Sequence, residues 1–124
     1  MGTRSPLFEV FPRFYPIRLI AGDSCVEMTV KIENKQEAPM WVECSIAVPE
    51  GISLAEKKQL SLGRIRVGII NSKECGEGRC KVFAMKKTAP GIYEIKLTAY
   101  GFSKDGNVIA TEEKKTELRC EEMK

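Results

Sequence analysis

The segment Cys75-Gly76-Glu77-Gly78-Arg79-Cys80 brings two thiols closer together in sequence than any other cysteines of the chain. Two of the four residues between them are glycines, which permit tight turns. We expect residues 71–78 to form a glycine-containing loop and residues 76–79 to form a hairpin end, across which Cys75 and Cys80 face each other. A disulfide, two free thiols and a metal site are all compatible with this spacing, and we predict a structural disulfide.

The rest of the composition offers little for catalysis. Histidine is absent, and the other cysteines are Cys25, Cys44 and Cys120. The chain therefore has no imidazole base and no histidine metal ligand. A zinc site usually needs paired ligands, a Cys-x-x-Cys redox motif is missing, and there is no phosphate-binding glycine loop. We predict a protein that is not an enzyme and that holds no cofactor or metal.

Two aromatic residues have alternative roles. The alternation of Val42 and Ile46 places Trp41 on an outer face, where an exposed tryptophan would bind a partner or a sugar ring. A bulge near Glu43 would instead turn Trp41 into the core, and we favour that placement while keeping Trp41 as the candidate partner-binding residue. Tyr93 follows a Pro-Gly turn at the start of a strand. We expect it to make a structural corner contact with the backbone.

Basic residues are abundant but mixed with acidic ones. Arg64 and Arg66 share one strand face, and the lysine pairs elsewhere are interrupted by glutamates. The net charge is only +3, whereas a nucleic-acid surface needs clustered positive charge. No apolar run approaches the roughly 20 residues needed to span a bilayer. We expect neither nucleic-acid binding nor membrane insertion.

The elements that must position these residues are strands. Apolar residues alternate with polar ones, and alternate side chains of a strand point to opposite faces. Pro12 makes the first strand suitable for a sheet edge, and Gly63 and Gly68 suggest bulges or close strand contacts. Residues 54–60 are expected to form a polar connection or one helical turn. The expected strands cover residues 7–14, 25–32, 40–48, 64–69, 81–85, 92–100 and 108–120.

Several faces of these strands follow from the alternation. In the 64–69 strand, Ile65, Val67 and Ile69 share one face. Asp105-Gly106 is typical of a hairpin loop. We expect one domain over residues 1–124, with residues 1–6 and 121–124 flexible. The predicted core residues are Val30, Ile32, Val42, Ile46, Ile95 and Leu97.

An ordered set of short motifs carries a family resemblance. The motifs are Val30-Lys31-Ile32-Glu33-Asn34, Val48-Pro49-Glu50-Gly51-Ile52, Leu62-Gly63-Arg64-Ile65 and Ala89-Pro90-Gly91-Ile92-Tyr93. In this order, across residues 22–111, they resemble the immunoglobulin-like accessory domains of prokaryotic, especially archaeal, surface proteins and glycosidases, of the NEW3 and CARDB type. The cysteines depart from that pattern. The resemblance implies a non-catalytic spacer or interaction module and supplies no binding residues.

We therefore expect an all-β, immunoglobulin-like antiparallel β-sandwich of about seven strands, because turn signals recur at sandwich-like intervals. Its expected function is that of a binding or structural module with an unidentified protein partner. The alternative is a small cysteine-based metal-binding or redox-responsive protein. Residues 1–10 do not have the pattern of a signal peptide, which slightly favours the cytoplasm. The abundance of lysine and glutamate is compatible with a thermophile.

Overall fold

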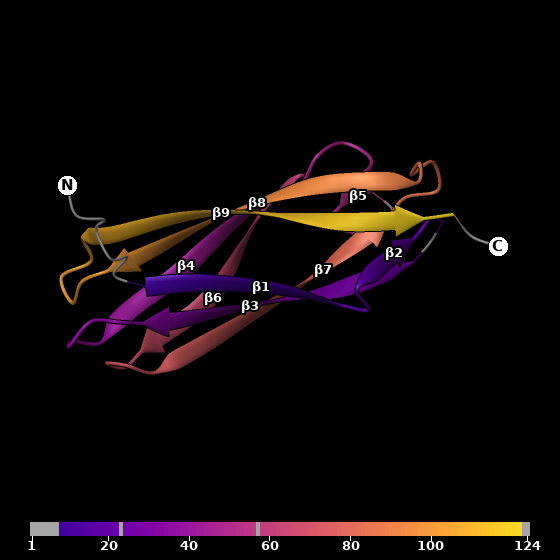
Figure 1. Ribbon diagram of the computed structural model, residues 1–124. Coiled ribbons are helices and arrows are strands. Elements are labelled where there is room, and N and C mark those ends of the chain that lie inside the picture. The colour runs from indigo at the N-terminus through magenta and orange to yellow at the C-terminus, as the bar shows by residue number, and fades with distance from the viewer. Residues whose placement is uncertain (1–7, 23, 57, 123–124) are drawn as a thin grey trace, which may run out of the picture.

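Two β-sheets face each other in the computed structural model, which describes residues 8–22, 24–56 and 58–122 (Figure 1). One sheet has the strand order β1-β3-β7-β5, and the other has the order β2-β9-β8-β4-β6. The strands are β1 (Phe8–Tyr15), β2 (Arg18–Ile20), β3 (Cys25–Asn34), β4 (Met40–Ala47), β5 (Ile52–Ser53), β6 (Leu62–Ile70), β7 (Cys75–Ala84), β8 (Gly91–Phe102) and β9 (Val108–Glu121).

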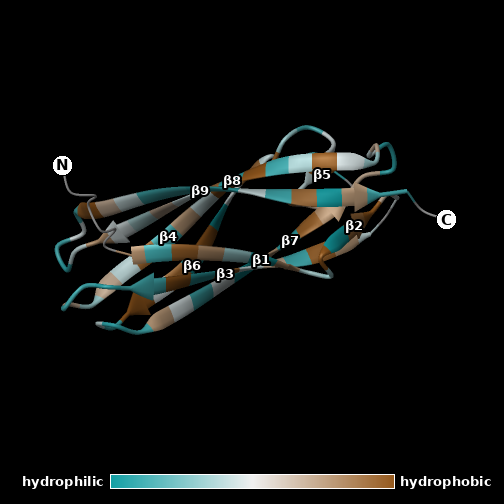
Figure 2. Cartoon of the chain, in the orientation of Figure 1, coloured by the Kyte–Doolittle hydropathy of each residue, from teal (hydrophilic) through white to brown (hydrophobic). Residues whose placement is uncertain are grey.

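Apolar residues at every second position build the core between the sheets. Figure 2 shows brown and teal residues alternating along the strands, and the buried residues of β3 and β4 follow the same period of two. A residue pointing inward from either sheet loses its contact with water, which provides the main driving force for this packing. All six predicted core residues are buried: Val30, Ile32, Val42, Ile46, Ile95 and Leu97.

The all-β sandwich is confirmed, with two differences in its strands. The described residues form the seven expected strands and two short ones, β2 and β5. The pairs among the seven expected strands are antiparallel, as predicted, whereas the short β2 pairs in parallel with β9. β2 and β5 were not predicted because strands of two or three residues are too short to show an alternation of apolar and polar residues. The expected edge strand is confirmed, because β1 lies at the end of the four-stranded sheet.

A bulge in β6 reverses the face of its last residues. Glu43 of β4 pairs with Arg66, while Val42 pairs with Gly68, so one residue of β6 is left over. Beyond this bulge Ile69 is 65% exposed and Ile70 is buried. The prediction that Ile69 shares one face with Ile65 is therefore wrong, because Ile65 is buried. The bulge suggested at Gly68 is confirmed.

The backbone at Gly68 explains why a glycine stands there. Its φ is +94°, in the left-handed region that other residues avoid. The region from 54 to 60, apart from residue 57, contains an isolated bridge between Ala55 and Lys58 rather than a helical turn. A hydrogen bond from the Leu54 amide to the Leu60 carbonyl, 2.9 Å long, joins the two ends of this segment.

The turns at 35–39, 71–74 and 103–107 lie together at one end of the sandwich, on the left of Figure 1. Asn34 ties the first two turns together from a fully buried position. Its side-chain amide donates to the carbonyls of Ala38 (2.9 Å) and Ile70 (3.0 Å), and its oxygen accepts from the Gln36 amide (2.9 Å). A buried amide satisfied in this way fixes both turns, and with them the start of β4.

Candidate functional site

Trp41 lies on the outer face of the five-stranded sheet, where 42% of its surface is exposed. The favoured prediction of a core tryptophan is therefore wrong. A register shift does occur beside Glu43, but the extra residue belongs to β6. β4 itself pairs with β8 in continuous register from Trp41 to Ala47. Its alternation is preserved, and the indole ring faces solvent.

Trp41 is part of a row of exposed apolar residues that crosses four strands. It is the direct partner of Ile69 in β6 and of Phe102 in β8, and Phe102 is in turn the partner of Val108 in β9. Val108 is 54% exposed, and Phe102 is half-buried. Directly opposed side chains of neighbouring strands point to the same face. We call Ile69, Trp41, Phe102 and Val108 the apolar row.

Bulges on both sides of the central β4–β8 pair bring this row together. The β6 bulge turns Ile69 outward, as described above. On the other side Gly101 pairs with Ala110 and Phe102 with Val108, so Ile109 is the extra residue of β9. Ile109 is also exposed. Bulges redirect side chains and commonly occur beside functional sites.

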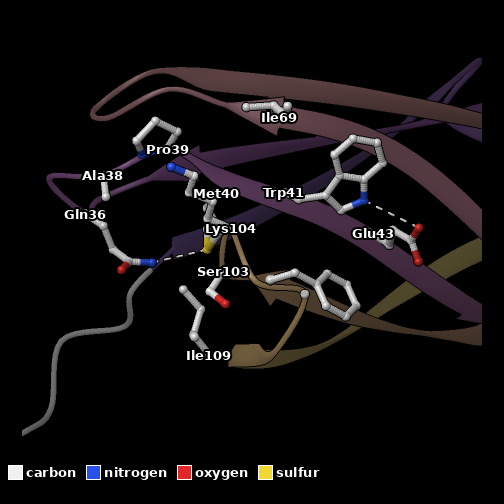
Figure 3. A pocket seen from close by; sticks show the side chains of 12 residues that line it. Gln36, Ala38, Pro39, Met40, Trp41, Glu43, Ile69, Ser103, Lys104 and Ile109 are labelled. Atoms are coloured by element: carbon white, nitrogen blue, oxygen red, sulfur yellow. Dashed lines mark hydrogen bonds between the residues drawn. The ribbon is translucent and has the colours of Figure 1, made fainter.

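A groove of about 790 Å³ lies over Ile69, Trp41 and Phe102 of the apolar row, at the end of the sandwich where the turns gather. Figure 3 shows Trp41, Ile69 and Ile109 around it, with the turn before β4 on one side and the β8–β9 hairpin on the other. The groove is lined mainly by carbon atoms and contains few charged groups, Glu43 and Lys104 among them. A groove of this size and character suits an apolar side chain of a ligand.

Two turns hold the rim of the groove. Ser72 donates to the Gln36 carbonyl (2.7 Å), and the Gln36 amide group approaches the Met40 sulfur at 3.2 Å (Figure 3). In the β8–β9 hairpin the Ser103 amide donates to the Asn107 carbonyl (2.8 Å). The Asp-Gly hairpin predicted from the sequence is confirmed, with Gly106 in the left-handed region at φ +85°.

A smaller polar hollow of about 290 Å³ lies next to the groove on the same face. The two depressions share Glu43 and Phe102. The polar hollow is also lined by Arg64, Ser45 and Tyr100, and by Val108 of the apolar row. The outer face of the sheet therefore carries an apolar groove beside a smaller and more polar hollow.

Cys75 and Cys80 do not face each other, because both belong to β7. They are opposite Glu33 and Met28 of β3, respectively. Residues five positions apart in an extended strand are about 16 Å apart and point to opposite faces. The predicted hairpin is wrong, and this strand excludes a disulfide between the two residues. All five cysteines are free thiols, with Cys25 and Cys75 exposed.

The two glycines between these cysteines serve packing rather than a turn. A Cβ on Gly78 would overlap the Cγ2 atom of Ile65, and one on Gly76 would lie 2.8 Å from Ile70 Cγ1 and 2.9 Å from Val67 Cγ1. β6 therefore passes directly over β7. Only residues without a side chain allow the two strands to approach this closely.

The buried thiols are poor nucleophiles. Burial raises the pKa of Cys44 to about 12 and, in the opposite sheet, that of Cys80 to about 11, and it also raises the pKa of Cys120. The thiolate is the reactive and metal-binding form, so these shifts oppose both uses. Within the described residues, no group of three or more Cys, Asp or Glu side chains is placed to hold a metal ion.

The predicted role of Tyr93 is confirmed. Its hydroxyl donates to the carbonyl of Ala89, four residues upstream, over 2.5 Å. A Cβ on Gly51, whose φ is +107°, would lie 3.0 Å from the Tyr93 ring. The tyrosine thus anchors a corner, as in many β-sandwiches. None of the described segments is a helix long and apolar enough to cross a membrane.

No protein-family model matches the chain, and no curated protein matches its sequence. Solved structures do resemble its fold. Native α2-macroglobulin of Escherichia coli, in a structure from domain MG7 to the C-terminus, matches 98% of this chain with a TM-score of 0.69 and 16% identity. The cohesin module of a Clostridium perfringens family 33 glycoside hydrolase matches 96% of it with a TM-score of 0.64 and 14% identity.

These matches differ in how much of the other protein they cover. This chain spans 17% of the α2-macroglobulin chain but 100% of the cohesin module. It spans 37% of a putative membrane-anchored protein from Corynebacterium diphtheriae, with a TM-score of 0.61 and 11% identity over 97% of this chain. Identities this low establish the fold alone. The chain has the fold of bacterial immunoglobulin-like β-sandwich domains.

Proposed function

We propose that this domain is a non-catalytic interaction module that binds a partner protein through the apolar row. The observation that carries the proposal is the exposure of Trp41 in the middle of this row, over a groove lined mainly by carbon. Exposed apolar patches of this kind mark interaction sites in soluble proteins. Tryptophan is also the residue type most enriched among interface residues that dominate binding energy.

The outer face of the other sheet supports the choice of surface by contrast. There Lys31 lies opposite Glu77, and Glu27 lies opposite Lys81. Opposite charges in neighbouring strands stabilise a sheet that faces water. The five-stranded sheet has no such charge pairing at the level of Trp41, where β6, β4, β8 and β9 each present an apolar side chain.

The matches to α2-macroglobulin and to the cohesin module are compatible with the same class of function, because both are matches to immunoglobulin-like β-sandwich domains. The closer likeness to the NEW3 and CARDB type of accessory domain is part of the proposal and rests on the motif order in the sequence. A metal-binding or redox role receives no support, since Cys75 and Cys80 lie about 16 Å apart in one strand.

A display library of random short peptides tests the proposal. Peptides selected on the native domain are titrated against the native protein, Trp41→Ser and the control Tyr15→Ser, which removes an aromatic side chain that is 82% exposed on the other sheet. We expect the Trp41 variant to weaken binding by about tenfold or more, as loss of an interface anchor does, and the control to leave it unchanged. Recovery of no peptide, or equal binding by Trp41→Ser, would contradict the proposal.

A further inference from the structure

The polar hollow beside the apolar groove indicates what kind of segment would bind there. We propose that the partner contributes an extended peptide in which one apolar side chain occupies the groove and one carboxylate, about four residues away, occupies the polar hollow at Arg64. This inference rests on the proposed function, because it uses the same face of the same sheet. Neither depression alone specifies such a peptide, but their positions side by side, with Glu43 and Phe102 shared, do.

Arg64 is an exposed cation with no ion-pair partner among the described residues. The arginines at 18 and 79 are, in contrast, paired with carboxylates. Ser45, the direct ladder partner of Arg64, and Tyr100 add two hydroxyl groups to the hollow. A guanidinium and hydroxyl donors around one depression fit a carboxylate, which accepts hydrogen bonds from both groups.

Glu43 restricts which residues the peptide can have between its apolar anchor and its carboxylate. It lies between the groove and the hollow, opposite Arg66 in the ladder, and accepts a long hydrogen bond from the Trp41 ring nitrogen at 3.5 Å (Figure 3). A ligand carboxylate directly above Glu43 would be repelled by it. The position between anchor and acid should therefore be neutral or polar.

The spacing follows from the strand repeat. Trp41, Glu43 and Ser45 are alternate residues of β4 on its outer face. Alternate residues of a strand are about 6.7 Å apart, so the Trp41 and Ser45 levels are separated by about 13 Å. An extended peptide running along β4 covers this distance with four residues. Either chain direction satisfies the pattern, with the acid before or after the anchor.

Charge also favours an acidic segment over a second copy of this chain. Among the described residues that line the two depressions, Lys104 and Arg64 are cationic and Glu43 is the single carboxylate. The whole chain carries a net charge of +3. Association of two like-charged surfaces is opposed, whereas an acidic peptide is attracted, and the attraction weakens with salt.

Two display libraries of short peptides with a fixed aromatic or leucine anchor test this inference. One library carries Asp or Glu about four positions before or after the anchor, and the other carries Lys at the same positions, with the remaining positions random. Binders from each are titrated against the native protein, Arg64→Glu, Arg64→Lys, Trp41→Ser and the control Arg13→Glu. The control makes the same charge change on the outer face of the other sheet.

We expect the acidic library to yield binders that Arg64→Glu weakens by about tenfold or more, that Arg64→Lys weakens less, and that Arg13→Glu does not affect. Equal recovery of Trp41-dependent binders from the Lys library, or binding insensitive to Arg64→Glu, would overturn the inference while leaving the proposed function standing. Failure of both libraries to yield binders that depend on Trp41 would count against the proposed function itself. A concentration-dependent dimer of the native protein that Trp41→Ser abolishes would show that the occupant is a second copy, which also overturns the inference.

Discussion

At Gly78 the absence of a side chain lets β6 lie directly on β7. A Cβ at this position would overlap Ile65 Cγ2. We predict that Gly78→Ala lowers the free energy of unfolding by about 1–3 kcal/mol, the usual cost of overpacking a core. Urea denaturation measures the change. The same substitution in an Ile65→Ala background should cost clearly less, and an equal cost in both backgrounds would contradict the steric explanation.

The buried thiol of Cys44 should make stability depend on alkaline pH. Its pKa is raised from 9.0 to about 12 in the folded protein, so the unfolded chain releases this proton first as pH rises. The free energy of unfolding is therefore unaffected below pH 9 and falls above it, by about 1.4 kcal/mol per pH unit for one thiol. Cys80 adds a smaller loss in the same direction toward pH 11, because it is only half-buried.

Urea denaturation at several pH values from about 8 to 11 measures this effect. Replacing Cys44 with Ala should reduce the dependence and leave the part that Cys80 contributes, while replacing the exposed Cys25 should leave it unchanged. A slope as steep in the Cys44→Ala variant as in the native protein would show that Cys44 does not cause the loss.

These residues also show where sequence reasoning stops. The alternation of apolar and polar residues correctly placed the six core residues inside, because the face of each one depends only on its position within its own strand. The outward direction of Trp41 depended on which of two paired strands carries a bulge, and that is a property of the pair. The glycines at 76 and 78 suggested a turn, since nothing local distinguishes a glycine needed for φ > 0 from one needed for close packing by a distant strand.

Among the strands, β6 adds Ile69 to the apolar row, because its bulge turns this side chain outward. Its bulge depends on the left-handed backbone of Gly68. We predict that Gly68→Ala lowers the free energy of unfolding by about 1–2 kcal/mol and that Gly68→Asn costs less, because asparagine tolerates this conformation better. Thermal or urea denaturation compares the two variants. Equal costs, or a larger cost for asparagine, would argue against backbone strain.

The strands that the sequence did not predict share a physical reason. β2 and β5 are held by pairing with β9 and β7, not by an apolar pattern of their own. The first half of β7 was expected to be a loop because its glycines and charges lack alternation, yet it pairs with β3 from Cys75 onward. In these segments tertiary pairing outweighs local propensity.

For the molecule as a whole, stability should reside between the two sheets. Ile95 is fully buried in β8, while Ile92 in the same strand is exposed. We predict that Ile95→Ala costs about 2–5 kcal/mol of unfolding free energy and that the matched Ile92→Ala costs less than about 1 kcal/mol. Chemical denaturation gives both values. Similar losses for the two variants would mean that the inner and outer faces of β8 are wrongly assigned.

The fluorescence of Trp41 tests most directly whether the apolar row is a binding surface. Trp41 is the only tryptophan of the chain, so its emission reports on this surface alone. We predict efficient quenching by acrylamide in the free protein, and a blue-shifted, shielded emission when a selected peptide is bound at saturation. An indole that is already shielded in the free protein, or whose emission and quenching do not change on saturation, would contradict binding at the apolar row.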